Sequence, residues 1–254
     1  MKLSAGNDND AGSVTFRFDG ELSFFLSPEQ KANTFTYRFD GRPSVKDAIE
    51  AHHVPHTEVG CILINGSPSD FTAHLYDTQH IEVYPVISET AVSCPLQLRS
   101  TPALRFVADV HLGKLTRYLR LLGFDVFYKR DFDDPDIIRC ALKETRIILT
   151  RDRRMLHVKE IDHGCCLHSQ NAAEQLHQLN ERYSLKDNTK PFSRCLTCNG
   201  LLHDVEKDTI IDRLEPKTIR YYKNFKQCES CGKVFWRGSH IEALEKVLGG
   251  IADT

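Results

Sequence analysis

The sequence predicts a chain of several small domains, α+β at its N-terminal end and α/β in its centre, followed by a compact metal-binding module. Three observations support this prediction. Early strands and one short helix follow a β-β-α-β-β order, a second strand-and-helix alternation begins near residue 104, and four cysteines form two C-x-x-C pairs near the C-terminus. With 254 residues, 41% of them hydrophobic, the chain can build two or three compact units and needs no single large core.

The N-terminal domain is expected to span residues 14–88. Residues 1–13 are rich in Asn, Asp, Gly and Ser and have little to bury, so they are expected to form a disordered tail. Apolar patterning predicts four strands and a Ser-capped helix, with the helix at 44–51 and the strands at 14–18, 34–39, 60–64 and 80–86. This order resembles the ubiquitin-like β-grasp domains related to small sulfur-carrier proteins. The resemblance implies that a protein partner binds through this domain.

Sulfur-carrier chemistry is not expected for this domain. A carrier needs a free Gly-Gly terminus, whereas the last strand continues into residues 89–103, which are rich in Ser, Thr and Pro and read as a linker. The pair Gly249-Gly250 follows a helix predicted at 241–248 and is expected to end that helix. The histidines of His52-His53-x-x-His56 are expected to form a solvated polar face rather than a metal site.

The central domain is expected to span residues 104–186. Its predicted strands are 104–108, 124–128, 146–150 and 165–168, and its predicted helices are 111–122, 135–144 and 172–183. Strands that alternate with helices imply a parallel sheet with helices on both faces. Because ligands of such sheets bind at the carboxyl ends of the strands, the residues that follow each strand are the first candidates for a site.

Aspartates follow two of these strands. Asp109 ends the first strand, Asp152 lies just beyond the third, and Asp133, Asp134 or Asp136 near the start of a helix can bring a third carboxylate to the same edge. Converging carboxylates repel one another unless a cation neutralises them, and oxygen ligands suit Mg²⁺ or Mn²⁺, which can activate water against a phosphate. Aspartate also favours helix caps, and for Asp134, which precedes Pro135, this alternative stays open.

Basic residues lie near these aspartates in the sequence. Lys114, Arg117 and Arg120 fall opposite a leucine stripe on the helix predicted at 111–122, and Arg151 adjoins Asp152. They could hold a phosphate backbone, or they could form a solvated face with ion pairs, and the spacing does not choose between the two. The net charge of −2 gives no overall attraction to nucleic acid, so any such binding depends on local patches of this kind.

The four cysteines Cys195, Cys198, Cys228 and Cys231 predict a structural zinc ribbon, expected to span residues 190–254 with the helix at 241–248 as its end. Each C-x-x-C pair places two thiolates on one tight turn, and two such turns complete a tetrahedral set with no position left for substrate. Asn199-Gly200 and Gly232 follow the pairs and supply residues that tolerate positive φ. Strands are expected at 204–211 and 218–225.

Three blocks of the sequence carry a more specific resemblance. They are Phe106-Val107-Ala108-Asp109 with Leu112-Gly113-Lys114-Leu115, then residues 117–125, RYLRLLGFD, and then residues 146–153, RIILTRDR. With the cysteine pairs, these blocks resemble the mutator-seven C-terminal RNase family, a branch of the PIN-like ribonucleases. The resemblance implies a PIN-like domain before a four-cysteine zinc ribbon, often with a ubiquitin-like domain in front. It also implies nuclease action on RNA, with Asp109, Asp134 and Asp152 at the acidic positions.

The sequence therefore predicts a metal-dependent ribonuclease that hydrolyses RNA phosphodiester bonds with metal-bound water, while Arg117, Arg120 or Arg151 positions the phosphate. The alternative is a catalytically inactive RNA-binding or adaptor protein that uses the β-grasp and ribbon modules. Basic and aromatic residues interleave in the ribbon, which suits phosphate contact and base stacking or else forms the core of the ribbon: Tyr221, Tyr222, Lys223, Phe225, Lys226, Lys233, Phe235, Trp236 and Arg237.

The expected location is the cytoplasm. No positively flanked apolar segment opens the chain, and no run of about 18 apolar residues could cross a membrane. Nine cysteines in such a chain fit a reducing compartment.

Overall fold

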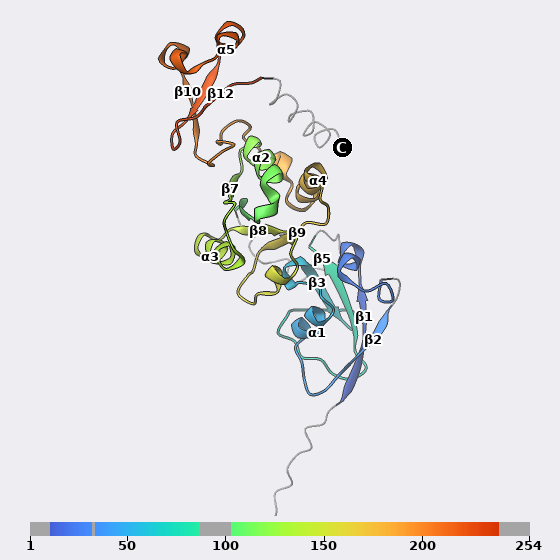
Figure 1. Ribbon diagram of the computed structural model, residues 1–254. Helices are drawn as coiled ribbons and strands as arrows, with labels where there is room; N and C mark the ends of the chain where they lie inside the picture. The colour runs from blue at the N-terminus through green and yellow to red at the C-terminus, as the bar shows by residue number, and fades with distance from the viewer. Residues whose placement is uncertain (1–10, 32–33, 87–102, 239–254) are drawn as a thin grey trace, which may run out of the picture. The chain divides into compact units, whose positions relative to one another are not determined.

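The computed structural model describes residues 11–31, 34–86 and 103–238, which belong to two compact units (Figure 1). Unit 1 comprises Met1–Thr101 and Asp152–Cys166, and unit 2 comprises Pro102–Arg151 and Leu167–Thr254. The segment 152–166, which the sequence analysis assigns to the central domain, thus groups with the N-terminal domain. The predicted helix at 241–248 and most of the predicted tail and linker lie outside the described residues.

Unit 1 contains a mixed five-stranded sheet in the order β2-β1-β5-β3-β4. The strands are β1 (Gly12–Phe18), β2 (Phe35–Phe39), β3 (Val59–Ile64), β4 (Ser67–Ser69) and β5 (His80–Pro85). β1 runs parallel to β5, and the other neighbours are antiparallel. This arrangement agrees with the predicted β-grasp fold. The sequence analysis did not find β4, since three residues that include a proline are too short for a strand pattern.

Helix α1 (Val45–Ala51) begins with a capping box, because the Ser44 hydroxyl accepts from the Asp47 backbone N–H while the Asp47 carboxylate accepts from the backbone of Ser44. Just beyond its end, the expectation of a solvated histidine face is wrong. His52 and His56 are both buried. His52 lies among aromatic rings of β1 and β2, so tertiary packing covers a face that local sequence would leave in water.

The segment 152–166 is tied to the rest of unit 1 by polar contacts. The buried Cys166 backbone N–H donates to the Glu58 carboxylate over 2.7 Å, and His56 Nε2 contacts the Ile161 carbonyl at 2.7 Å. The Arg153 guanidinium donates to the Phe24 carbonyl over 3.2 Å and lies over the Phe24 ring. The segment itself contains the short 3₁₀ helix η5 (Arg154–His157) and the strand β9 (Gly164–Cys166).

Unit 2 contains the parallel strands β7 (Asp125–Phe127), β6 (Arg105–Ala108) and β8 (Ile147–Thr150), which adjoin in that order. β8 is buried throughout, as expected of a parallel strand covered on both faces. Three helices flank the strands: α2 (Gly113–Leu121), α3 (Asp134–Glu144) and α4 (Ala172–Tyr183). α2 packs beside α4, while α3 packs against β6 and β8, as Figure 1 shows.

The ribbon of unit 2 is an antiparallel sheet of β10 (Leu202–Val205), β11 (Phe225–Cys228) and β12 (Val234–Phe235). The strand predicted at 218–225 is wrong, since Pro216–Tyr221 forms helix α5 and β11 begins only at Phe225. Pro216 is the reason, because its fixed φ suits the first turn of a helix. Phe225 is in the ribbon core with Trp236 packed against it, whereas Tyr221 is 68% exposed.

Every helix within the described ranges is too short or too polar to cross a membrane.

Candidate functional site

Asp109 follows β6 directly and lies at the carboxyl ends of β6 and β8. Its backbone N–H donates to the Leu149 carbonyl over 3.0 Å, and its carboxylate accepts from the Thr150 hydroxyl over 2.8 Å. The residue is only 7% exposed. Two hydrogen bonds to the end of β8 thus fix a buried aspartate at the sheet edge where ligands of this fold class bind.

Asp134 is the first residue of α3 and is exposed. The capping function left open for it belongs instead to Asp133, whose carboxylate accepts from the Asp136 backbone N–H over 2.9 Å. Asp136 in turn pairs with Arg139 at 2.6 Å. Asp133 and Asp136 therefore have structural partners that explain them without a ligand.

Asp152 is the first residue of the segment that belongs to unit 1, whereas Asp109 and Asp134 belong to unit 2. Its exposed carboxylate accepts from the Arg154 backbone N–H over 2.8 Å. Among the described residues, the four cysteines alone form a group of three or more His, Cys, Asp or Glu whose ligand atoms lie within 4.8 Å of one another. The aspartates therefore form no such group within either unit.

The cysteine set fits zinc. The sulfur atoms of Cys195 and Cys231 lie 3.7 Å apart and those of Cys198 and Cys228 lie 3.4 Å apart. Tetrahedral zinc with Zn–S bonds of about 2.3 Å requires sulfur atoms about 3.8 Å apart, so a small adjustment admits the ion. Four thiolates leave no coordination position for substrate, so the ion would serve to hold the two turns together.

The turns around this cysteine set use two of the three residues that the sequence singled out for positive φ. Asn199 adopts φ 74° and Gly232 adopts φ 69°. The backbone N–H of each donates to the carbonyl of the first cysteine of its pair, four residues earlier in the chain. The left-handed turn after each C-x-x-C pair is thus a local property that the sequence predicts.

The basic residues predicted to contact phosphate have different environments. Lys114, Arg117 and Arg151 are exposed, whereas Arg120 is 3% exposed. The Arg120 guanidinium donates to the Val126 carbonyl over 2.8 Å and to the Thr197 carbonyl over 3.0 Å. Burial lowers the pKa of Arg120 from its ordinary value. This side chain joins α2 to β7 and to the first cysteine turn, and its donors are engaged by backbone carbonyls.

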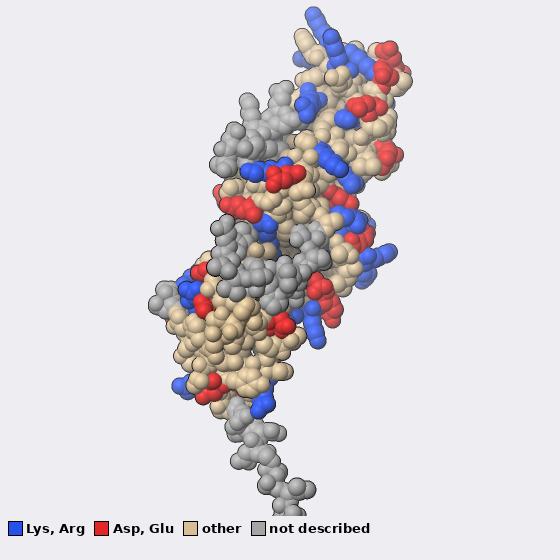
Figure 2. All heavy atoms as spheres, turned by 180° about the vertical axis from the view of Figure 1, so that it is seen from behind, with Lys and Arg blue, Asp and Glu red and all other residues tan. Residues whose placement is uncertain are grey.

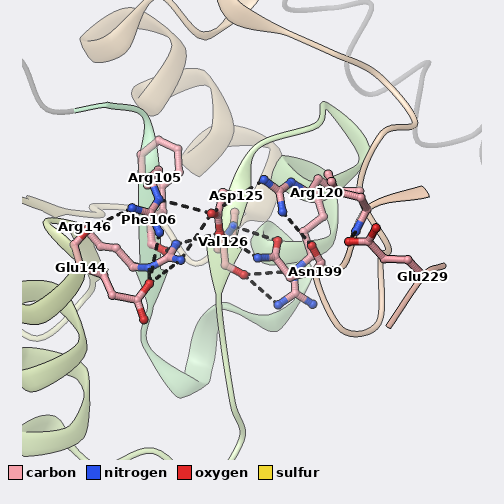
Figure 3. Close-up of polar contacts among 11 residues, drawn as sticks. Arg105, Phe106, Arg120, Asp125, Val126, Glu144, Arg146, Asn199 and Glu229 are labelled. Atoms are coloured by element: carbon pink, nitrogen blue, oxygen red, sulfur yellow. Dashed lines mark hydrogen bonds and ion pairs between the residues drawn. The ribbon is translucent and has the colours of Figure 1, made fainter. Parts of the chain in front are cut away.

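Asp125 also links the sheet to the ribbon (Figure 3). The sequence pattern indicates no function for this residue. Its carboxylate accepts from Arg146 over 2.8 Å and from the Asn199 side-chain amide over 2.8 Å, while Asn199 Oδ1 accepts from the Val126 backbone N–H over 3.0 Å. Burial alone would raise the pKa of Asp125, but hydrogen bonds from Arg146 and Asn199 outweigh it and lower the pKa to about 2. The carboxylate is therefore ionised and anchors the first cysteine turn.

Comparison with protein families accounts for both units. A family model described as the Mut7-C RNAse domain matches residues 104–248. A second model, described as Mut7-C ubiquitin, matches residues 11–91. No curated protein and no solved structure gave a match.

Proposed function

We propose that this chain, which belongs to the Mut7-C RNAse domain family, is a ribonuclease that hydrolyses RNA phosphodiester bonds. The observation that carries the proposal is the family match across the parallel sheet and the ribbon together. The position of Asp109, fixed at the carboxyl end of β6 beside Thr150, supports it further. The ubiquitin-like domain supports a protein partner, and we take the protein to act in the cytoplasm, as the sequence predicts.

In this proposal Asp109, Asp134 and Asp152 are the acidic residues of the active site. Asp109 has the strongest support because it is held at the edge of the sheet, whereas the other two are exposed. Lys114, Arg117 and Arg151 are proposed to contact phosphate, and Arg120 is left out because its donors are already engaged. A divalent ion, Mg²⁺ or Mn²⁺, is proposed as the catalytic cofactor on ligand chemistry alone, since oxygen donors suit both ions.

The test is cleavage of end-labelled single-stranded and structured RNAs by the zinc-loaded protein with Mg²⁺, Mn²⁺ or EDTA. Asp109→Asn and Asp152→Asn should each lower the rate by at least about 100-fold, the usual scale for loss of a group that acts in the chemical step. Asp212→Asn is the matched control, because Asp212 is an exposed aspartate of the ribbon. It should cut like the wild type. Full activity in the Asp109→Asn variant would overturn the assignment of Asp109.

The second candidate is an RNA-binding adaptor without turnover. The observation that favours it is the lack of a three-carboxylate ligand set among the described residues. Under this alternative, the wild type retains labelled RNA in a binding assay but cuts no substrate with any ion. Cleavage that requires the divalent ion and is lost in both Asp109→Asn and Asp152→Asn would support the ribonuclease and exclude the adaptor.

A further inference from the structure

A cleft of about 820 Å³ lies between α2, the segment that follows β7 and the first cysteine turn, all within unit 2. Lys114 and Arg117 of α2 line it, as do Lys129 and Arg130 beyond β7. Leu196 and Thr197 of the ribbon complete a wall. The α2 region and the ribbon thus both line the cleft, and Arg120 and Asp125 link these two parts.

The cleft is positively charged. Counting Arg120, five of the eleven described residues that line it are Lys or Arg, and none of the eleven is acidic. On the face drawn in Figure 2, by contrast, basic and acidic side chains are interspersed. Among the described residues, no carboxylate forms an ion pair with Lys114, Arg117, Lys129 or Arg130. Cations gathered without counter-charges repel one another, so an anion in the cleft would be stabilised.

A buried hydroxyl in the same wall has no partner. Thr116 lies on α2 between Lys114 and Arg117 and is 1% exposed, yet its hydroxyl finds no hydrogen-bond partner among the described residues. A buried polar group left unpaired costs about 1–3 kcal/mol. A ligand oxygen placed in the cleft would remove that cost, so Thr116 independently indicates a polar ligand.

Tyr128 links the lining of the cleft to the loop that follows Asp109. The Tyr128 hydroxyl donates to the Val110 carbonyl over 2.9 Å, and Val110 follows Asp109 directly. Gly113 permits this approach, because a Cβ at that position would lie 2.9 Å from the Tyr128 hydroxyl. Tyr128 and Phe235 also bring two aromatic rings into the lining.

We propose that this cleft binds the sugar-phosphate backbone of a single RNA strand and leads it to Asp109. Lys114, Arg117, Lys129 and Arg130 contact phosphates, and the Thr116 hydroxyl pairs with a phosphate or ribose oxygen. A single strand fits better than a duplex, since its exposed bases can stack on aromatic side chains. The inference rests on the proposed function for its choice of RNA, and it adds Thr116, Lys129 and Arg130, which the sequence analysis did not mark.

The test measures binding apart from cleavage. Fluorescence anisotropy would follow a 5′-labelled 12-nucleotide oligouridine and a labelled RNA duplex, each titrated with zinc-loaded full-length protein without Mg²⁺ or Mn²⁺ over a range of salt concentrations. The variant Lys129→Gln/Arg130→Gln removes two cleft cations. The control Lys143→Gln/Lys186→Gln removes two exposed cations of unit 2 that do not line the cleft. Zinc content and thermal unfolding of each variant verify that the fold is intact.

The cleft variant should bind the single strand at least about 10-fold more weakly and reduce the salt slope by about 2, about one for each lost phosphate contact. The control should change affinity less than about 2-fold, on the same reasoning that distant cations make no phosphate contact. Thr116→Val should bind more weakly with an unchanged salt slope and without loss of stability, since it removes an unpaired hydroxyl and keeps the shape.

Equal affinity of the cleft variant and the control would overturn the proposal, as would tighter binding of the duplex than of the single strand. Cleavage assays on the same proteins separate this result from the proposed function. Binding that fails only in the cleft variants, in a protein that cuts nothing, would retain the cleft and reject the nuclease. Cleavage of RNA, with binding unaltered in those variants, would retain the nuclease and reject the cleft.

Discussion

Single residues of this protein owe their properties to neighbours distant in sequence, and His52 is the clearest case in unit 1. The rings of Phe16, Phe35 and Tyr37 lie 4.8–5.4 Å from its imidazole, edge to face. Gln30 contacts Nδ1 at 3.0 Å, whereas Nε2 has no partner among the described residues. Burial lowers the pKa of His52 to about 4, with a smaller contribution from His53. The side chain is therefore neutral in the folded protein near neutral pH.

This predicts a specific loss of stability in mild acid. Because the folded pKa of His52 is about 4 and the unfolded value is about 6.5, only the unfolded state takes up the proton between these values. The stabilisation is complete above pH 6.5 and decreases as the pH falls to 4, by up to about 3 kcal/mol. Urea unfolding at several pH values should show a flatter pH dependence for His52→Phe than for wild type. The exposed His177, changed to Gln, is the control.

At the scale of elements, the joint between the sheet and the ribbon depends on Asp125. Arg146, Arg105 and Asn199 all contact its carboxylate. Asp125→Asn removes the charge and leaves Arg146, which is nearly fully buried, with Glu144 as its remaining carboxylate partner among the described residues. We expect about 3 kcal/mol of destabilisation in urea, the usual cost of breaking a buried pair, and faster transfer of zinc to a chelator. The control Asp131→Asn, at an exposed aspartate, should change neither the stability in urea nor the rate of zinc transfer.

The stabilisation contributed by Asp125 depends on pH in the direction typical of a carboxylate. Its folded pKa of about 2 lies below the unfolded value, so the stabilisation is complete above pH 4 and decreases as the pH falls towards 2. Wild type and Asp125→Asn should therefore differ least at the acid end of a stability profile. A difference that stayed constant from pH 6 to pH 2 would contradict the assignment of the charge to Asp125.

The sequence predicts those elements whose signal is local. Apolar runs such as Ile147–Thr150 and the spacing of the cysteine pairs specify the parallel strands and the metal set without knowledge of contacts. Arg120 shows the limit of this reasoning. It lies opposite the leucine stripe and so reads as solvated, but the ribbon covers it. The cleft and the contacts of Asp125 depend in the same way on which surfaces meet, and that information is not local.

At the scale of the whole molecule, the order of the chain does not match the order of the units. The chain enters unit 2, returns to unit 1 for Asp152–Cys166, and then completes unit 2 with α4 and the ribbon. Unit 1 therefore contains both the ubiquitin-like domain and the segment that begins with Asp152, an acidic residue of the proposed active site.

A substitution of Glu58 tests whether the N-terminal domain restrains the segment 152–166. Its carboxylate is buried and accepts from the Cys166 backbone N–H over 2.7 Å, so Glu58→Ala leaves that N–H unpaired. We expect a loss of about 1–3 kcal/mol, the cost of an unpaired buried donor, and with it faster tryptic cleavage at Arg154 or Lys159 inside the segment. Glu29→Ala, at an exposed glutamate of the same unit, should leave both unchanged. Equal protection of the segment in the two variants would show that the domain does not restrain it. Faster cleavage in Glu58→Ala, together with lower ribonuclease activity at intact zinc content, would make the N-terminal domain part of the catalytic architecture.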